Sequence, residues 1–197
     1  MTRHVIPYPE LVNRWRPDAR ERLESAAWEL FAEQGFTATT VSEITARAGL
    51  TTRTFHRYFA DKREVIFAGE DVSAEIARLM TETPPATDSL ALLLAGLTTL
   101  ADTRYEGRRE AVRARCDLIA TDAGLREREL QKYAQIADAV RDGLVARGEE
   151  PARAALLAET CVTLLRVAVA EWLDRDDDTR LADLIRATLD TLRAALA

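Results

Sequence analysis

Residues 40–59 read TVSEITARAGLTTRTFHRYF, and this stretch decides the fold of the N-terminal part of the chain. Thr40 and Glu43 have the spacing of a capping box, in which the threonine hydroxyl and the glutamate carboxylate each accept a backbone N–H of the first helical turn. The apolar residues that follow at helical spacing are Val41, Ile44 and Ala48. Gly49 ends this pattern, which predicts a helix of about eight residues.

A second short helix is predicted directly after Gly49. Thr51 is suited to cap it, and Phe55 and Phe59 would face the core as the helix runs to Tyr58. Glycine permits the sharp bend between two such helices, and this arrangement is typical of a helix-turn-helix, whose second helix keeps one face free. The residues on that face are Thr52, Arg53, His56 and Arg57.

Charge is distributed unevenly along the chain. The net charge of -6 would, taken alone, argue against a nucleic-acid partner. Residues 1–67 carry 10 Lys or Arg and 9 Asp or Glu, net +1, whereas residues 68–197 carry a net -7. Five cations face only Asp61 within residues 45–63, so the helix-turn-helix lies in a short basic stretch of an acidic protein.

The rest of the sequence shows helical periodicity and no alternation typical of strands. Helices are expected at 18–34, 61–83, 87–105, 108–121, 125–147, 152–174 and 179–196, which with the two short ones makes about nine. We therefore predict an all-α fold. Its parts are an extended arm at 1–16, a three-helix head at 17–67 with the helix-turn-helix, and a helical body at 68–197.

Residue types that support catalysis or bind metals are scarce. The 2 Cys, Cys116 and Cys161, lack zinc-site spacing, and neither of the 2 His, His4 and His56, lies in the body. No Ser-His-Asp, Cys-His or di-iron pattern can be built there, so we expect no enzyme, metal or cofactor. No apolar run approaches the roughly 18 residues that span a bilayer, and we expect a cytoplasmic protein.

A longer pattern surrounds the helix-turn-helix. Its positions are Leu23, Ala26, Ala27, Leu30, Phe31, Gly35, Phe36, Thr40, Val41, Ile44, Ala48, Gly49, Leu50, Thr51, Thr54, Phe55, Tyr58, Phe59, Lys62 and Val65. This pattern resembles the N-terminal domain of the TetR family of transcriptional regulators. The resemblance implies a ligand-responsive repressor, with a DNA-binding head, a ligand-binding body and a homodimer that reads a palindromic operator.

The resemblance also implies which head residues contact DNA. The expected set is Thr40, Thr51, Thr52, Arg53, Thr54, His56, Arg57, Tyr58 and Lys62. Arg53 stands where the family often has a small residue, and its planar fork suits guanine O6 and N7. Tyr58 has core packing as its alternative. The arginines of the arm, Arg3, Arg14 and Arg16, either enter a minor groove or make no contact.

Two apolar stripes mark the C-terminal helices. The residues assigned from them to a dimer interface are Leu156, Leu164, Leu181, Leu184, Ile185, Thr188, Leu189 and Leu192. The family resemblance implies this interface, because core helices of a monomer would show the same stripes.

The ligand is expected among the helices of residues 87–174. Candidate wall residues are Leu93, Leu97, Ile119, Tyr133 and Trp172, each of which has the core as its alternative. Arg104, Arg108 and Arg115 would share a face of an unbroken helix and could hold an anion, although a solvated arginine face is the alternative. This stretch resembles TetR-family members that respond to acyl-coenzyme A, including regulators of mycofactocin systems. A helical ligand-binding or interaction protein without sequence-specific DNA binding is the alternative function.

Overall fold

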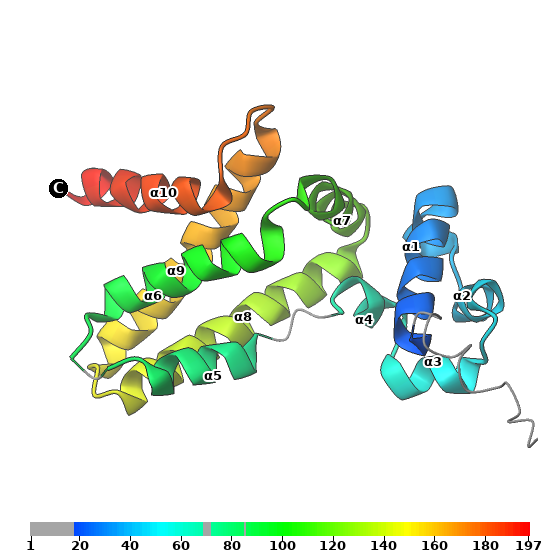
Figure 1. Ribbon diagram of the computed structural model, residues 1–197, viewed down its shortest axis with the longest axis horizontal. Helices are drawn as coiled ribbons and strands as arrows, with labels where there is room; N and C mark the ends of the chain where they lie inside the picture. The colour runs from blue at the N-terminus through cyan, green and yellow to red at the C-terminus, as the bar shows by residue number, and fades with distance from the viewer. Residues whose placement is uncertain (1–17, 69–71, 85) are drawn as a thin grey trace, which may run out of the picture. The chain divides into compact units, whose positions relative to one another are not determined.

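The computed structural model describes residues 18–68, 72–84 and 86–197, with only the backbone of Ser73. These residues divide after Ala68 into two compact units, which we call the head (18–68) and the body (72–84 and 86–197). Each regular element of both units is a helix (Figure 1). Nine of the described helices have seven or more residues, which confirms the predicted all-α fold. The predicted arm, with Arg3, Arg14 and Arg16, lies outside the described residues.

The head contains four helices. They are α1 (Ala19–Ala38), α2 (Val41–Ala48), α3 (Thr52–Tyr58) and α4 (Lys62–Ile66). α1 is kinked at Gly35, near the predicted end of the first helix. Leu23, Ile44 and Phe55 are completely buried, so each of the first three helices contributes a side chain to the core. Packing of this kind stabilises short helices that are marginal alone.

The turn between α2 and α3 fixes the helix-turn-helix. Gly49 adopts the left-handed conformation at φ 63°, a region that residues with a Cβ atom rarely enter. The backbone N–H of Leu50 donates to the carbonyl of Thr45 at 2.8 Å, as in a Schellman motif. The guanidinium of Arg22 on α1 also donates to the carbonyl of Ala48, so α1 holds the end of α2.

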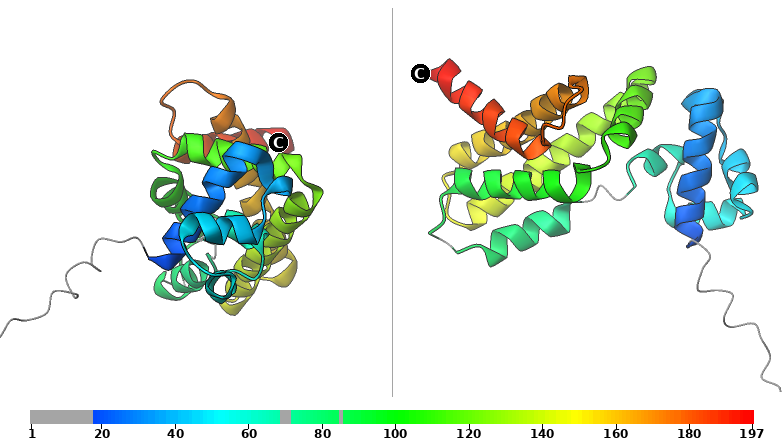
Figure 2. Two further views of the ribbon diagram at one scale, coloured as in Figure 1. Left: turned by 90° about the vertical axis from the view of Figure 1, so that its right-hand side faces the viewer. Right: turned by 45° about the horizontal axis from the view of Figure 1, so that its top comes forward.

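The body is a bundle built around two long helices. Its helices are α5 (Ser73–Glu82), α6 (Ser89–Leu100), the π-helical η2 (Ala101–Tyr105), α7 (Arg109–Thr121), α8 (Ala123–Ala146), α9 (Pro151–Asp174) and α10 (Leu181–Leu196). α8 and α9 lie side by side in both figures, α5 packs on α8, and α10 packs on α9 and α6 (Figures 1 and 2). Their apolar faces form one continuous core.

Two of the predicted helices are interrupted. The helix expected at 61–83 is instead α4 and α5, which are separate helices, so that prediction is wrong. The helix expected at 87–105 passes from α6 into the π-helical turn η2. Gly107, at φ 70°, then separates η2 from α7. None of the described helices combines the length and hydropathy needed to cross a membrane.

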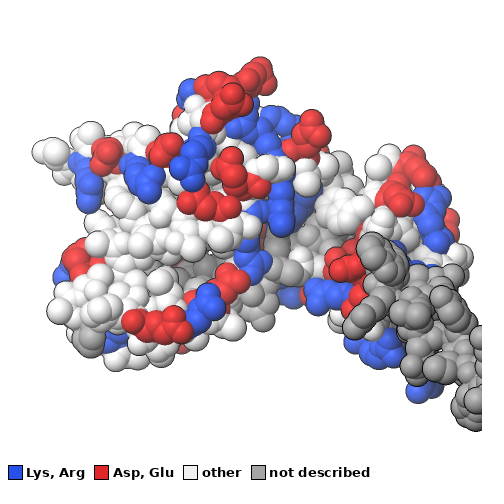
Figure 3. Space-filling view, viewed as in Figure 1, with Lys and Arg blue, Asp and Glu red and all other residues white. Residues whose placement is uncertain are grey.

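Charged side chains of the body are mostly interspersed. On the face seen in Figure 3, Lys or Arg alternates with Asp or Glu across the body. Three ion pairs of the body are Asp183–Arg186 at 2.9 Å, Asp190–Arg193 at 3.2 Å and Arg180–Asp102 at 2.7 Å. Exposed pairs of this kind contribute little to stability, but they leave the net negative charge spread over the surface.

Candidate functional site

The exposed face of α3 carries the predicted reading residues. Thr52, Arg53, His56 and Arg57 are all exposed, and Phe55 between them is completely buried. The guanidinium of Arg53 has no hydrogen bond or ion pair with any described residue, so its five donors face solvent. An arginine in this state keeps its planar fork available for a base edge or a phosphate.

The predicted threonines are engaged in helix caps. The Thr40 hydroxyl accepts the Glu43 N–H at 3.2 Å, and Glu43 accepts the N–H of Thr40 at 2.8 Å, which completes the capping box. The Thr51 hydroxyl accepts the Thr54 N–H at 3.2 Å and lies 3.0 Å from the Thr54 hydroxyl. The two caps fix the first turns of α2 and α3, where free backbone N–H groups favour anions.

Arg57 and Tyr58 form a unit at the C-terminal end of α3. The guanidinium of Arg57 lies 4.8 Å from the Tyr58 ring centroid and donates to its hydroxyl at 2.9 Å. Tyr58 itself is half-buried and lies 6.5 Å from the ring of Phe59. Tyr58 therefore packs partly against the core, and its ring also holds the guanidinium of Arg57 at the surface.

Lys62, which was predicted as a phosphate contact, holds the end of α1 in the structure. Its ammonium group donates to the carbonyls of Phe36 and Thr39, each at 2.7 Å, and to that of Thr37 at 3.4 Å. It also lies 4.2 Å from the centroid of the Phe36 ring. An ammonium has three donors, and these contacts use all of them to hold the end of α1.

The predicted wall residues of the body lie in its interior. Leu93, Leu97, Ile119 and Trp172 are buried. The Trp172 ring meets the ring of Tyr105 edge to face at 6.4 Å, and the guanidinium of Arg109 lies 4.8 Å from its centroid. Trp172 is thus buried between one aromatic ring and one guanidinium.

Tyr133 lies half-buried on α8. Burial, followed by the negative charge of Glu129, raises the pKa of its phenol above the ordinary value. The guanidinium of Arg166 on α9 lies 5.4 Å from the centroid of its ring. The phenol is therefore protonated at neutral pH and is a donor for a ligand or a buried acceptor.

The three arginines predicted to hold an anion do not share one helix face. The break at Gly107 places Arg104 in η2 and Arg115 in α7. Arg104 pairs with Glu75 at 2.5 Å, and Arg115 lies 3.8 Å from Glu129. Arg108 is exposed at the start of α7. The shared face required an unbroken helix through these three arginines. The helix is instead broken, because glycine allows the chain to turn between them.

Most residues predicted for the dimer interface lie in the core of the same chain. Those buried are Leu164, Leu181, Leu184, Ile185 and Leu189. Leu156 is 70% exposed, and Thr188 and Leu192 are half-buried. The apolar stripes of α9 and α10 therefore pack mainly on their own bundle, and of the eight predicted residues Leu156, Thr188 and Leu192 keep exposed surface for a partner.

Sequence reasoning missed two arginines that structure singles out. Arg109 and Arg113 lie in sequence beside the three arginines predicted to hold an anion, and the sequence pattern assigns them no role. Arg109 donates to backbone carbonyls of residues 175–179, and Arg113 donates to the carbonyl of Leu173. The one signal in the sequence is their i, i+4 spacing, which places both side chains on the same face of a helix.

Comparison with known proteins connects the two units to one family. Residues 24–68 match the model "Bacterial regulatory proteins, tetR family", and residues 87–197 match the MftR C-terminal domain. A Mycobacterium tuberculosis relative named as a mycofactocin biosynthesis transcriptional regulator, MftR, is 26% identical, with 97% of this chain and 98% of the relative covered.

Two solved structures are similar in fold. A TetR-family regulator from Syntrophomonas wolfei has a TM-score of 0.62 at 15% identity, covering 90% of this chain and 94% of its own. Thermus thermophilus FadR, solved with lauroyl-CoA, has a TM-score of 0.55 at 21% identity, covering 88% and 92%. With both parts of the chain matched, the protein belongs to the TetR family of DNA-binding transcriptional regulators, with an MftR-type C-terminal domain.

Proposed function

We propose that this protein is a homodimeric repressor that reads a palindromic operator and is released by a small molecule. The observation that carries the proposal is the exposed face of α3, where Arg53 projects without a partner among the described residues. α3 is held by the Gly49 turn and the Thr51 cap, so the reading residues stand on a rigid support. The recognition helix of such a motif enters the major groove.

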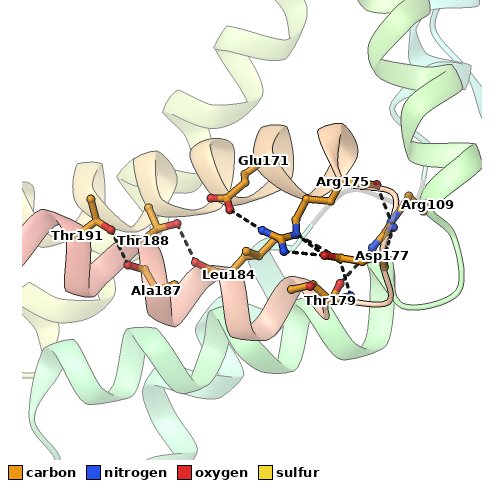
Figure 4. A network of polar contacts seen from close by, with 9 residues as sticks. All are labelled: Arg109, Glu171, Arg175, Asp177, Thr179, Leu184, Ala187, Thr188 and Thr191. Carbon is orange, nitrogen blue, oxygen red and sulfur yellow. Dashed lines mark hydrogen bonds and ion pairs between the residues drawn. The ribbon is translucent and has the colours of Figure 1, made fainter.

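Exposed apolar residues on α9 and α10 support the proposed dimer. Leu156 and Val167 on α9 are 70% and 49% exposed, and Leu196 on α10 is 80% exposed. The hydroxyls of Thr188 and Thr191 donate to carbonyls of their own helix, so these hydroxyls need no hydrogen-bond acceptor from a partner chain (Figure 4). We assign the dimer contact to these exposed positions rather than to the buried stripe.

The effector is proposed to bind in the body near Trp172 and Tyr133. The lauroyl-CoA bound by the FadR relative and the MftR-type C-terminal domain favour an acyl-CoA-like or other hydrophobic, anionic molecule. The phenol of Tyr133 and the exposed guanidinium of Arg108 are the groups available to orient its polar end. Binding would change the separation of the heads and lower the affinity for two half-sites. We place this activity in the cytoplasm, where the operator is.

Selection of bound fragments from host genomic DNA tests the operator proposal. We expect an enriched site with two inverted half-sites, their centres about one helical turn or more apart, bound by two chains. Scrambling one half-site is expected to lower the affinity strongly. Enrichment of no common sequence, with equal affinity for all fragments, would contradict a sequence-specific repressor.

A thermal-shift experiment tests the effector class. Lauroyl-CoA is expected to raise the Tm of the protein, because a ligand of the native state stabilises it. Arg108→Glu should diminish the shift if Arg108 contacts the anionic end, whereas Glu127→Gln, an exposed change on α8, should leave it unchanged. Stabilisation by dodecanol but not by lauroyl-CoA would reject the anionic effector.

A further inference from the structure

Two arginines of α7 hold the C-terminal end of α9. Arg113 donates from Nη2 to the carbonyl of Leu173 in the last turn of that helix. Arg109, one turn earlier on α7, donates from Nη1 to the carbonyl of Asp177 at 2.7 Å and of Arg175 at 3.3 Å, and from Nη2 to that of Thr179 at 3.1 Å. Figure 4 shows Arg109 reaching into this connection between α9 and α10.

The end of α9 relies on these donors. The helix stops at Asp174, and Arg175 is extended at φ -90° and ψ 146°. Among the described residues, no backbone hydrogen bond from the N–H of Arg175 closes the last turn. The last carbonyls of a helix need partners, and a nearby cation both donates to them and favours the negative end of the helix dipole. Arg113 and Arg109 supply both the hydrogen-bond donors and the positive charge at this end of α9.

The connection also has an internal brace. The carboxylate of Asp177 accepts hydrogen bonds from the guanidinium of Arg175 at 2.6 Å and from the backbone N–H of Thr179 at 3.0 Å (Figure 4). The hydrogen bond from Arg175 lowers the pKa of Asp177 below its ordinary value, so this carboxylate is ionised at neutral pH. These contacts of Asp177 shape the loop between α9 and α10, whose carbonyls accept hydrogen bonds from the guanidinium of Arg109.

Arg109 touches the predicted effector region as well. Its guanidinium lies 4.8 Å from the centroid of Trp172, whose edge-to-face neighbour is Tyr105 at 6.4 Å. A molecule that occupied the same face of the Trp172 ring would have to displace this guanidinium. The chain just before α7 leaves the α-helical path at the π-helical turn η2 and at Gly107, so α7 is joined to α6 by a bend rather than a continuous helix.

We propose that Arg109 and Arg113 are positioning residues, which set the direction in which the chain leaves α9 and enters α10. The backbone of α7 packs chiefly against α8, so the link from α7 to this connection is made by the two side chains. Through Arg109, the surroundings of Trp172 are coupled to the helices that carry the exposed apolar positions. This coupling rests on the proposed function, because it takes α9 and α10 as the dimer contact.

Hydrogen exchange of the full-length protein tests the positioning role. Arg109→Gln and Arg113→Gln should each speed amide exchange over residues 173–188 by about tenfold or more, with α8 and the head unchanged. Arg109→Lys keeps the charge without the fork and should give an intermediate rate. The control is Arg141→Gln, since among the described residues Arg141 forms ion pairs with Asp138 and Asp142 of its own helix alone. Unchanged exchange over 173–188, or an equal rise throughout the body, would overturn the proposal.

Sedimentation of the same variants tests the coupling. Arg109→Gln is expected to weaken self-association by about tenfold relative to Arg141→Gln, because α10 no longer has a fixed start. If exchange over residues 173–188 rises while self-association matches that of the wild type, the coupling is overturned and the positioning role stands. If the wild type is a monomer at all concentrations, the proposed dimer fails with the coupling, and the exchange result alone decides the positioning role.

Discussion

Arg53 and Arg57 lie one turn apart on the exposed side of α3, and they differ in what holds them. Arg57 is stacked on Tyr58 and hydrogen-bonded to its hydroxyl, so its position is fixed before DNA arrives. Arg53 has no partner among the described residues of the head and keeps its whole fork for a ligand. A fixed cation suits a phosphate, which sets register, and a free fork suits a guanine edge, which sets specificity.

Arg53→Ala should therefore weaken specific binding more than non-specific binding. We expect a loss of about 1–3 kcal/mol on the selected operator, roughly five- to 150-fold in Kd. On random DNA of the same length the loss should be severalfold smaller, because only a phosphate attraction is removed. Both affinities are measured at one salt concentration. Equal losses on the two DNAs would end the base-reading role of Arg53.

Lys62 is predicted to act on the stability of the head. Lys62→Met removes hydrogen bonds to the carbonyls of Phe36, Thr37 and Thr39 and should lower the free energy of unfolding by about 2–3 kcal/mol. Arg20→Met breaks a surface pair with Glu24 and a guanidinium contact 5.8 Å from the Phe59 ring centroid, and should cost about 1 kcal/mol or less. Chemical denaturation measures both. If Lys62→Met left the stability of the protein unchanged but weakened its DNA affinity, this result would support Lys62 as a phosphate contact instead.

At the scale of single helices, the agreement between sequence and structure follows the local signals. The Thr40 and Thr51 caps and the Gly49 turn are encoded by neighbouring residues, and the structure confirms α2 and α3. The break between α4 and α5 had only the weak signal of Gly69 in the sequence, and it was missed. The π-helical turn η2 depends on tertiary packing and has no sequence signal.

The capping box of α2 predicts a pH dependence. The hydrogen bonds from the Thr40 hydroxyl and N–H hold the pKa of Glu43 below its ordinary value. A lowered pKa in the folded state contributes stability above the unfolded pKa, about 4.3, and this stability is lost as the pH falls through the folded value. Glu43→Gln should therefore lower the Tm at pH 7, and its difference from the wild type should shrink as the pH falls through the folded pKa of Glu43. A Tm difference that stays constant from pH 7 to acid pH would contradict this linkage.

Two glycines of the body give opposite predictions for one substitution. A Cβ atom at Gly143 on α8 would lie 2.6 Å from Cγ of the buried Met80, whereas one at Gly96 on α6 would lie 2.7 Å from Cδ2 of Leu79, the end of a partly exposed side chain. Alanine gains about 1 kcal/mol in a helix, and overpacking costs about 1–3 kcal/mol. Gly143→Ala should therefore destabilise the protein, and Gly96→Ala should be neutral or stabilising. Equal effects in denaturation would show that α5 adjusts freely.

At the scale of the whole molecule, periodicity cannot tell a core stripe from an interface stripe. Both bury apolar residues on one helix face, and the sequence of α10 is consistent with either. The structure separates them, because Leu181, Leu184 and Ile185 pack into the core of the body, while Leu156 and Val167 on α9 remain exposed. The proposed interface therefore rests on residues that the bundle leaves uncovered.

Val167→Glu should then convert the protein into a monomer with an intact fold. A carboxylate at this position, where the valine is 49% exposed, adds no strain within the chain but would be buried without a partner in a dimer. Operator affinity should fall by about 100-fold or more, because a monomer loses the high effective concentration of the second head. Leu130→Glu, at a 57% exposed position on α8, is the matched control and should stay dimeric. Sedimentation measures the oligomeric state of both variants, and operator binding measures their DNA affinity. A dimeric Val167→Glu protein would place the interface elsewhere.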